Sequence, residues 1–64
     1  MTDAENFTKE ELHEALRAIT STIGKCEKVL PKLEEGTPQH TLLVRRIRAL
    51  RISAALIERE MGEG

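Results

Sequence analysis

The sequence of 64 residues contains almost no aromatic side chains: one Phe, no Tyr and no Trp. Proteins that hold bases, sugars or flavins by stacking use aromatic rings, so this mode of binding has little support here. Cysteine is equally scarce. Cys26 is the only one, and an internal disulfide is therefore impossible.

Long apolar runs are also missing, since no stretch approaches the roughly 20 residues that a membrane-spanning helix needs. Residues 1–6 are polar and acidic, unlike the basic and then apolar start of a secretory signal. The formal net charge is −1, which gives no general attraction to nucleic acid or acidic lipid. These features predict a cytoplasmic protein that makes no contact with a membrane.

The first helix is predicted to begin at about residue 8. Thr8 and Glu11 have the spacing of a capping box, in which each side chain satisfies the backbone N–H of the other residue. Apolar residues then recur at alternating intervals of four and three, which is the heptad pattern of a helix with one buried face. This first seam consists of Leu12, Leu16, Ile19, Ile23, Cys26, Leu30 and Leu33.

A bend is predicted at residues 36–37. Gly36 suits the left-handed conformation that follows a helix end, and Thr37 followed by Pro38 suits the start of a new helix. The second helix, about residues 38–61, carries a second seam with the same alternating intervals. Its residues are His40, Leu43, Ile47, Leu50, Ala54, Ile57 and Met61.

The two seams mirror each other about a point between Gly36 and Thr37, so that Leu33 faces His40 and Leu12 faces Met61. Turn chemistry places the bend at the same point for independent reasons. The sequence therefore predicts an all-α fold, an antiparallel two-helix hairpin with coiled-coil-like packing. Residues 1–64 form a single helical-hairpin domain, with a first helix of about residues 8–35.

Pro31 conflicts with a continuous first helix, because it cannot donate a hydrogen bond to the Glu27 carbonyl and its ring clashes with that turn. The seam nevertheless continues to Leu33. We therefore expect a kink or break at Pro31, or a short separate turn at residues 31–35. The alternative is a helix that ends at Leu30, with residues 31–37 as a loop.

The second helix carries further apolar residues opposite and beside its seam. A helix that is apolar on opposite faces is buried on both, whereas a surface helix has one apolar stripe. Two helices also bury too little apolar area to be stable alone. The sequence therefore predicts self-association into a four-helix bundle or a larger assembly, as a homodimer or homotetramer. The predicted interface consists of Leu42, Val44, Ala49, Ile52 and Leu56.

Four arginines near one face of the second helix support an alternative. Such a ridge could follow a phosphate backbone, or it could flank an apolar interface and pair with Glu10, Glu14 or Glu27 of the first helix. The pairing is favoured, because nothing aromatic or glycine-rich accompanies the ridge. The residues for possible contact with nucleic acid are Arg45, Arg48, Arg51 and Arg59.

No residues form a catalytic or metal-binding pattern. Cys26 is expected to be a small buried side chain in the seam, and His40 a partly buried residue at its end. His and carboxylate residues lack the paired helical spacing of a metal site. We therefore expect no enzyme activity, no metal and no cofactor.

The length and layout of the chain resemble the ROP-like class of small bacterial hairpins. The resemblance implies that the chain dimerises into a four-helix bundle and could bind RNA. The segment from Gly36 to Leu43, followed by Arg46 to Leu50, also looks like small bacterial proteins of unknown function. Taken together, the expected function is a non-enzymatic, homo-oligomeric helical-bundle protein that acts as an interaction or regulatory module. Another protein is a possible partner, and ROP-like nucleic-acid binding is the alternative.

Overall fold

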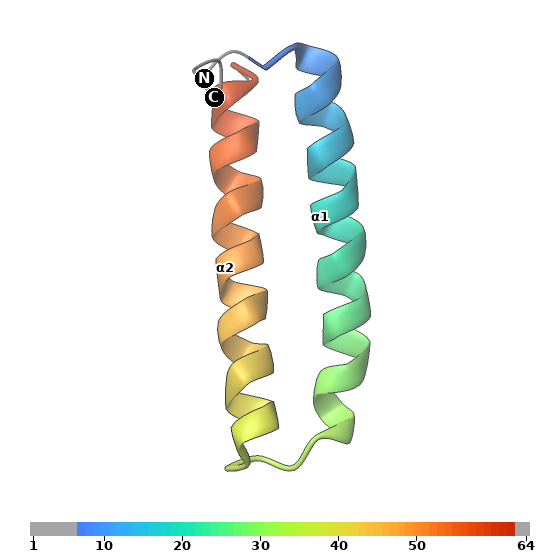
Figure 1. Cartoon of the computed structure of the whole chain (residues 1–64), viewed down its shortest axis with the longest axis vertical. Coiled ribbons are helices and arrows are strands. Elements are labelled where there is room, and N and C mark those ends of the chain that lie inside the picture. Colours follow the sequence, from blue (N-terminus) through green and yellow to red (C-terminus); the bar gives the residue numbers. More distant parts are fainter. Residues whose placement is uncertain (1–6, 63–64) are drawn as a thin grey trace.

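A computed structural model describes residues 7–62, which fold as two antiparallel helices lying side by side (Figure 1). Helix α1 is Lys9–Val29, a short 3₁₀-helix η2 is Leu30–Lys32, and helix α2 is Pro38–Glu60. These residues contain no strand. The predicted all-α fold with two helices packed against each other is confirmed.

Both predicted helix starts are present. The Thr8 N–H donates to Glu11 Oε1 at 2.9 Å, and the Glu11 N–H donates to Thr8 Oγ1 at 3.0 Å, which completes the capping box. At the start of α2, the His40 N–H donates to Thr37 Oγ1 at 3.2 Å, while the Thr37 hydroxyl donates to the Glu34 carbonyl at 2.7 Å. Thr37 therefore ties the bend to the helix that follows it.

The first α-helix ends earlier than predicted, at Val29 instead of about residue 35. The Leu30 N–H still donates to the Cys26 carbonyl, but Pro31 has no N–H to continue the pattern. The chain tightens into η2 and then becomes extended at Leu33, where φ is −96° and ψ is 146°. The break at Pro31 is thus a short 3₁₀-turn, followed by a non-helical connection over residues 33–37.

Two glycines adopt the left-handed conformation that side chains disfavour. Gly36 has a φ of 90° and lies in the bend directly before Thr37, as predicted for a reversal of the chain. Gly62 has a φ of 80° and follows Met61, the C-cap of α2. Together with Thr37, Gly36 fixes the bend at the predicted position.

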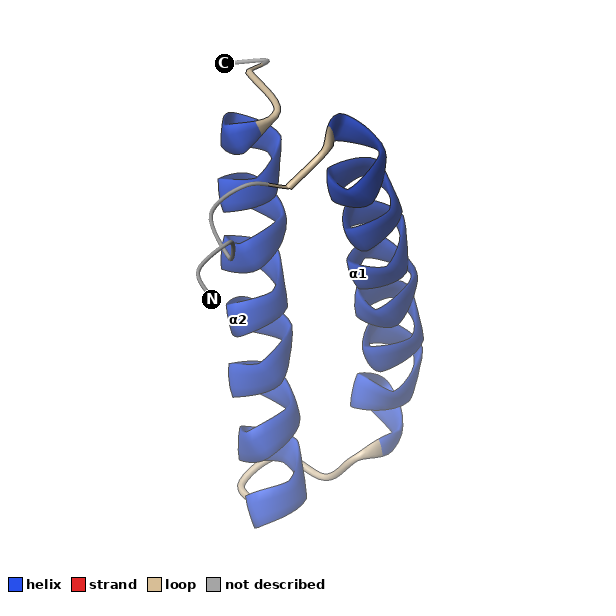
Figure 2. Cartoon of the chain, turned by 45° about the horizontal axis from the view of Figure 1, so that its top comes forward, coloured by secondary structure: helices blue, strands red, loops and turns tan. Residues whose placement is uncertain are grey.

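The seam forms the contact between the helices. Leu12, Ile47 and Met61 are buried, and the other eleven seam residues are partly buried. Outside the seam, every residue in 7–62 is exposed except Thr37, Val44 and Ser53. Figure 2 shows the same two ribbons from a second direction, with neither helix covered by another described segment. The core is a single line of side chains that remains partly open to solvent.

Candidate functional site

The outer side of α2 exposes three large apolar side chains. Leu42 is 57% exposed, Ile52 is 56% exposed and Leu56 is 54% exposed. Ala49, between them on the same side, is also exposed. Val44 differs, because it is partly buried beside the seam. Four of the five residues predicted for an interface therefore form an accessible apolar stripe, which we call the outer stripe: Leu42, Ala49, Ile52 and Leu56.

Helix α1 contributes one large exposed apolar residue. Val29 is 44% exposed, and Ala15 and Thr22 lie fourteen and seven residues before it on the same side of the helix. The predicted interface left these three residues out. The signal that could have included them is their regular spacing of seven, which keeps them beside the seam in every heptad.

One ion pair joins the two helices, between the Arg51 guanidinium and the Glu27 carboxylate. Of the three glutamates that the sequence offered to the arginine ridge, only Glu27 forms an ion pair with it. Both side chains are substantially exposed, at 62% and 44%. Exposed pairs of this kind contribute about 0–1 kcal/mol, so this contact adds little to the stability of the hairpin.

The remaining predicted arginines are free of ion pairs within residues 7–62. Arg45, Arg48 and Arg59 are all exposed on α2. They lie around the side of the helix that faces away from the seam, and the outer stripe runs among them. The predicted ridge is therefore accessible at three of its four positions.

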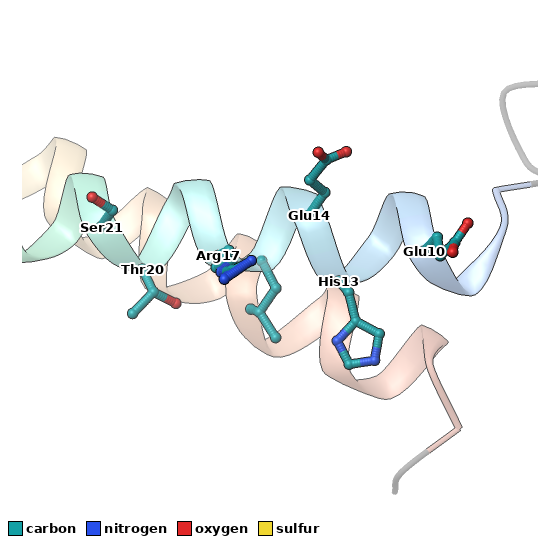
Figure 3. A pocket seen from close by; sticks show the side chains of 7 residues that line it. Glu10, His13, Glu14, Arg17, Thr20 and Ser21 are labelled. Atoms are coloured by element: carbon teal, nitrogen blue, oxygen red, sulfur yellow. The ribbon is translucent and has the colours of Figure 1, made fainter.

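A depression that is open to solvent lies along α1 (Figure 3). All of its lining residues belong to this one helix, so no second element closes it over a ligand. In the view of Figure 3, His13 and Glu14 point in opposite directions. Its polar groups do not converge on a common point, as the groups of a binding pocket do. The lining residues are Glu10, His13, Glu14, Leu16, Arg17, Thr20 and Ser21.

The residues with potential metal or nucleophile chemistry lie apart. Cys26 is partly buried in the middle of the seam, and His40 is partly buried at the bend end of α2. Across residues 7–62, no three His, Cys, Asp or Glu side chains are grouped closely enough to hold a metal ion. Neither described helix has the length and apolar character needed to cross a membrane.

Comparisons of the chain with family models, with curated proteins and with solved structures gave no match. The resemblance to ROP-like hairpins stays a prediction, because nothing in these comparisons bears on it. A functional proposal for this chain therefore depends on the chemistry of its own surfaces.

Proposed function

We propose that the chain is a non-enzymatic, homo-oligomeric helical-bundle protein that acts as an interaction or regulatory module. The observation that supports this proposal is the outer stripe, where Leu42, Ile52 and Leu56 are each more than half exposed on one side of α2. Large apolar side chains exposed together on one side of a helix are typical of a protein contact. A helix that is apolar on two opposite sides is suited to the interior of a bundle.

The thin core gives a second reason for assembly. Among residues 7–62, only Leu12, Ile47 and Met61 are buried, and no side chain in this range is fully enclosed. A chain of this size gains little stability from one partly exposed line of contacts, whereas packing several hairpins together buries the same side chains further. Self-association would therefore stabilise each hairpin as well as cover the outer stripe.

The test is the combined substitution of Ile52→Glu and Leu56→Glu, with molar mass measured by light scattering after size exclusion over a range of concentrations. We expect the natural chain to have the mass of a dimer or tetramer. The variant should approach the mass of one chain and unfold at lower temperature, because two charges would be buried in the contact.

A matched control places comparable changes on the outer side of α1. Ser21→Glu with Lys25→Gln changes the net charge by the same amount at the same spacing of four residues. This control should keep the mass of the natural chain. If the α2 variant also keeps its mass and stability, the outer stripe is not part of the assembly contact.

A second candidate is nucleic-acid binding through the arginine ridge, which is favoured by the exposure of Arg45, Arg48 and Arg59 without ion-pair partners in residues 7–62. Binding of this kind weakens steeply as salt rises, because counterions are released from the phosphates. A mobility-shift assay with mixed RNA and DNA at low salt tests it. No shift at micromolar protein would count against this candidate and leave the assembly proposal unaffected.

A further inference from the structure

The exposed side of α2 carries a third line of regularly spaced residues. Two arginines extend the outer stripe, so that the intervals between successive members are three, four, three, four and three. This alternation is the same heptad pattern that forms the seam between the two helices, and it keeps every member on one side of the helix. All of the members are exposed. We call this set the outer line: Leu42, Arg45, Ala49, Ile52, Leu56 and Arg59.

The outer line is not covered within the hairpin. Leu42, Ile52 and Leu56 are each more than half exposed, and α1 packs on the opposite side of α2, against the seam. Neither Figure 1 nor Figure 2 shows another described segment beside α2. A heptad line is buried by a second helix, and its arginines limit the choice of that helix, because like charges that face each other in a contact repel.

The outer line is complementary to a reversed copy of itself. When two α2 helices run antiparallel with a two-fold axis between Ala49 and Ile52, Ala49 meets Ile52 of the partner subunit, so a small side chain lies against a large one. Leu42 and Leu56 each meet an arginine, whose apolar stem can lie on the leucine while its charged head stays in water. No member of the line is left uncovered. The pairs, each occurring twice, are Leu42 with Arg59 of the partner subunit, Arg45 with Leu56 of the partner subunit, and Ala49 with Ile52 of the partner subunit.

A parallel pair of α2 helices is disfavoured by the same residues. It would place Arg45 against Arg45 of the partner subunit and Arg59 against Arg59 of the partner subunit, where like charges repel. It would also place Ala49 against Ala49 of the partner subunit, and two small side chains leave a gap in the contact. Charge and size therefore both favour the antiparallel pair.

The antiparallel pair gathers arginines on one face of the assembly. Arg48 directly precedes Ala49 and lies beside the outer line, on the side to which Arg45 and Arg59 also lean. In antiparallel helices the equivalent flanks meet, so the two copies bring six arginines to one face. None of these arginines forms an ion pair within residues 7–62. The opposite flank has no net charge, since its members are Arg46, Ser53 and Glu60.

Six like charges on one face oppose assembly until an anion neutralises them. Arg45 and Arg59 lie fourteen residues apart, which is about 21 Å along a helix that rises about 1.5 Å per residue. A single small anion reaches only part of this row, whereas a linear chain of phosphate groups can follow all of it. Arginine suits such a ligand, because its planar guanidinium donates two parallel hydrogen bonds to phosphate oxygens.

We propose that two copies of the chain pair back to back along the outer line, with the two α2 helices antiparallel at the centre, and that this contact forms a site for a linear chain of phosphate groups. The site is incomplete in one hairpin, because each copy supplies half of its arginines. Assembly and phosphate binding therefore strengthen each other by the same factor, as linkage requires. This proposal rests on the proposed self-association and adds its contact, its register and the ligand that regulates it.

The first test measures the dissociation constant of the natural dimer by sedimentation, with and without inorganic polyphosphate at constant pH and ionic strength. Polyphosphate should tighten dimerisation about tenfold. Added sodium chloride should tighten the dimer when polyphosphate is absent, because it screens the repulsion between arginines, and should weaken it when polyphosphate is present. A dissociation constant that polyphosphate leaves unchanged or raises overturns the proposal.

A second arm of this test replaces polyphosphate with RNA at an equal concentration of phosphate groups. Equal tightening by both means that the site binds a phosphate chain from either source. Tightening by one alone identifies the source that the site accepts. If neither tightens the dimer, the proposal is wrong.

The second test removes the arginines with the combined substitutions Arg45→Gln, Arg48→Gln and Arg59→Gln. Without polyphosphate this variant should dimerise at least as tightly as the natural chain, because the repulsion is gone while most of each stem remains. It should also lose the response to polyphosphate. The matched control removes three positive charges from α1 and should keep the response: Arg17→Gln, Lys25→Gln and Lys28→Gln. Equal loss of the response in both triple variants would show that net charge alone matters, and would overturn the site.

The third test determines the direction of the contact with a short bis-maleimide in chains carrying Cys26→Ala. Leu42→Cys and Arg59→Cys are placed in separate chains of different mass. The reagent should link these two chains to each other and should not link the Leu42→Cys chain to itself. Self-linking at Leu42 would indicate a parallel pair, and no linking at all would exclude the back-to-back contact. Circular dichroism checks that each variant is helical, and the first two tests decide the matter if one is not.

These outcomes separate the two proposals. A natural chain that is monomeric at every concentration, with or without polyphosphate, overturns both the proposed self-association and the phosphate site. A stable oligomer whose dissociation constant does not respond to polyphosphate or RNA overturns the site alone.

Discussion

The two helices have similar lengths, 21 residues in α1 and 23 in α2, but they expose different surfaces. Outside its seam, α1 exposes charged, polar and small residues, and its only large exposed apolar side chain is Val29. Helix α2 exposes Leu42, Ile52 and Leu56 as well as most of the arginines. One helix therefore has a single apolar side, and the other has two.

This difference shows where the hairpin is incomplete. A helix with one apolar side can bury that side against one neighbour, as α1 does against α2. Helix α2 still presents an apolar stripe after that contact has formed, so a further partner should approach through α2 and the face beside it. The predictions below test whether the two sides of α2 and the outer side of α1 differ in this way.

The largest effect is expected from Ile47→Ala, which removes a side chain that is only 8% exposed in the seam. The free energy of unfolding should fall by about 3 kcal/mol, because a cavity is left in a thin core. Ile52→Ala removes the same atoms from a position that is 56% exposed in the single hairpin, so at protein concentrations too low for assembly it should cost less than half as much. Chemical denaturation followed by circular dichroism measures both. Equal losses would show that the two sides of α2 are equally buried in solution.

An intermediate effect is expected at the helix starts. Thr37→Ala should lower the free energy of unfolding by about 1 kcal/mol, because the His40 N–H loses its acceptor. Thr8→Ala should cost a similar amount through loss of the capping box. Thermal unfolding of both variants compares how much the N-caps of α1 and α2 contribute to stability. A much smaller loss for Thr37→Ala would mean that the bend does not depend on its hydroxyl.

A smaller effect of opposite sign is expected at Gly24, an exposed residue inside α1. A methyl group added there would meet nothing within 4 Å, so Gly24→Ala should raise the free energy of unfolding by up to about 1 kcal/mol. The mass of the assembly should not change, because Gly24 is exposed on α1 and the outer stripe lies on α2. A loss of mass would contradict the view that this side of α1 faces solvent.

The smallest effect is expected from the ion pair. A double-mutant cycle with Glu27→Gln and Arg51→Gln should give a coupling energy of about 0.5 kcal/mol, because both side chains are largely exposed. The coupling should shrink as salt is raised from low to molar concentration. A coupling of several kcal/mol that resists salt would show that the ion pair becomes buried in the assembly.

Much of the hairpin could be predicted from local signals. The seam residues, the capping box at Thr8 and the bend at Gly36 and Thr37 depend on spacing and on backbone chemistry within a few residues. Each is present as expected. The end of α1 could not be predicted in the same way. Pro31 forbids a regular helix but permits a kink, a turn or a loop, and the choice depends on keeping Leu33 against α2, where it is partly buried.

The sequence by itself determined two helices, one seam on each, and the point at which the chain reverses, because heptad spacing and helix capping are local properties. Only the tertiary structure decided that Glu27, among three glutamates, pairs with Arg51. That choice depends on how far each helix is rotated about its own axis when the seams meet. The rotation is set by packing between residues of different helices, and no pattern within one helix records it.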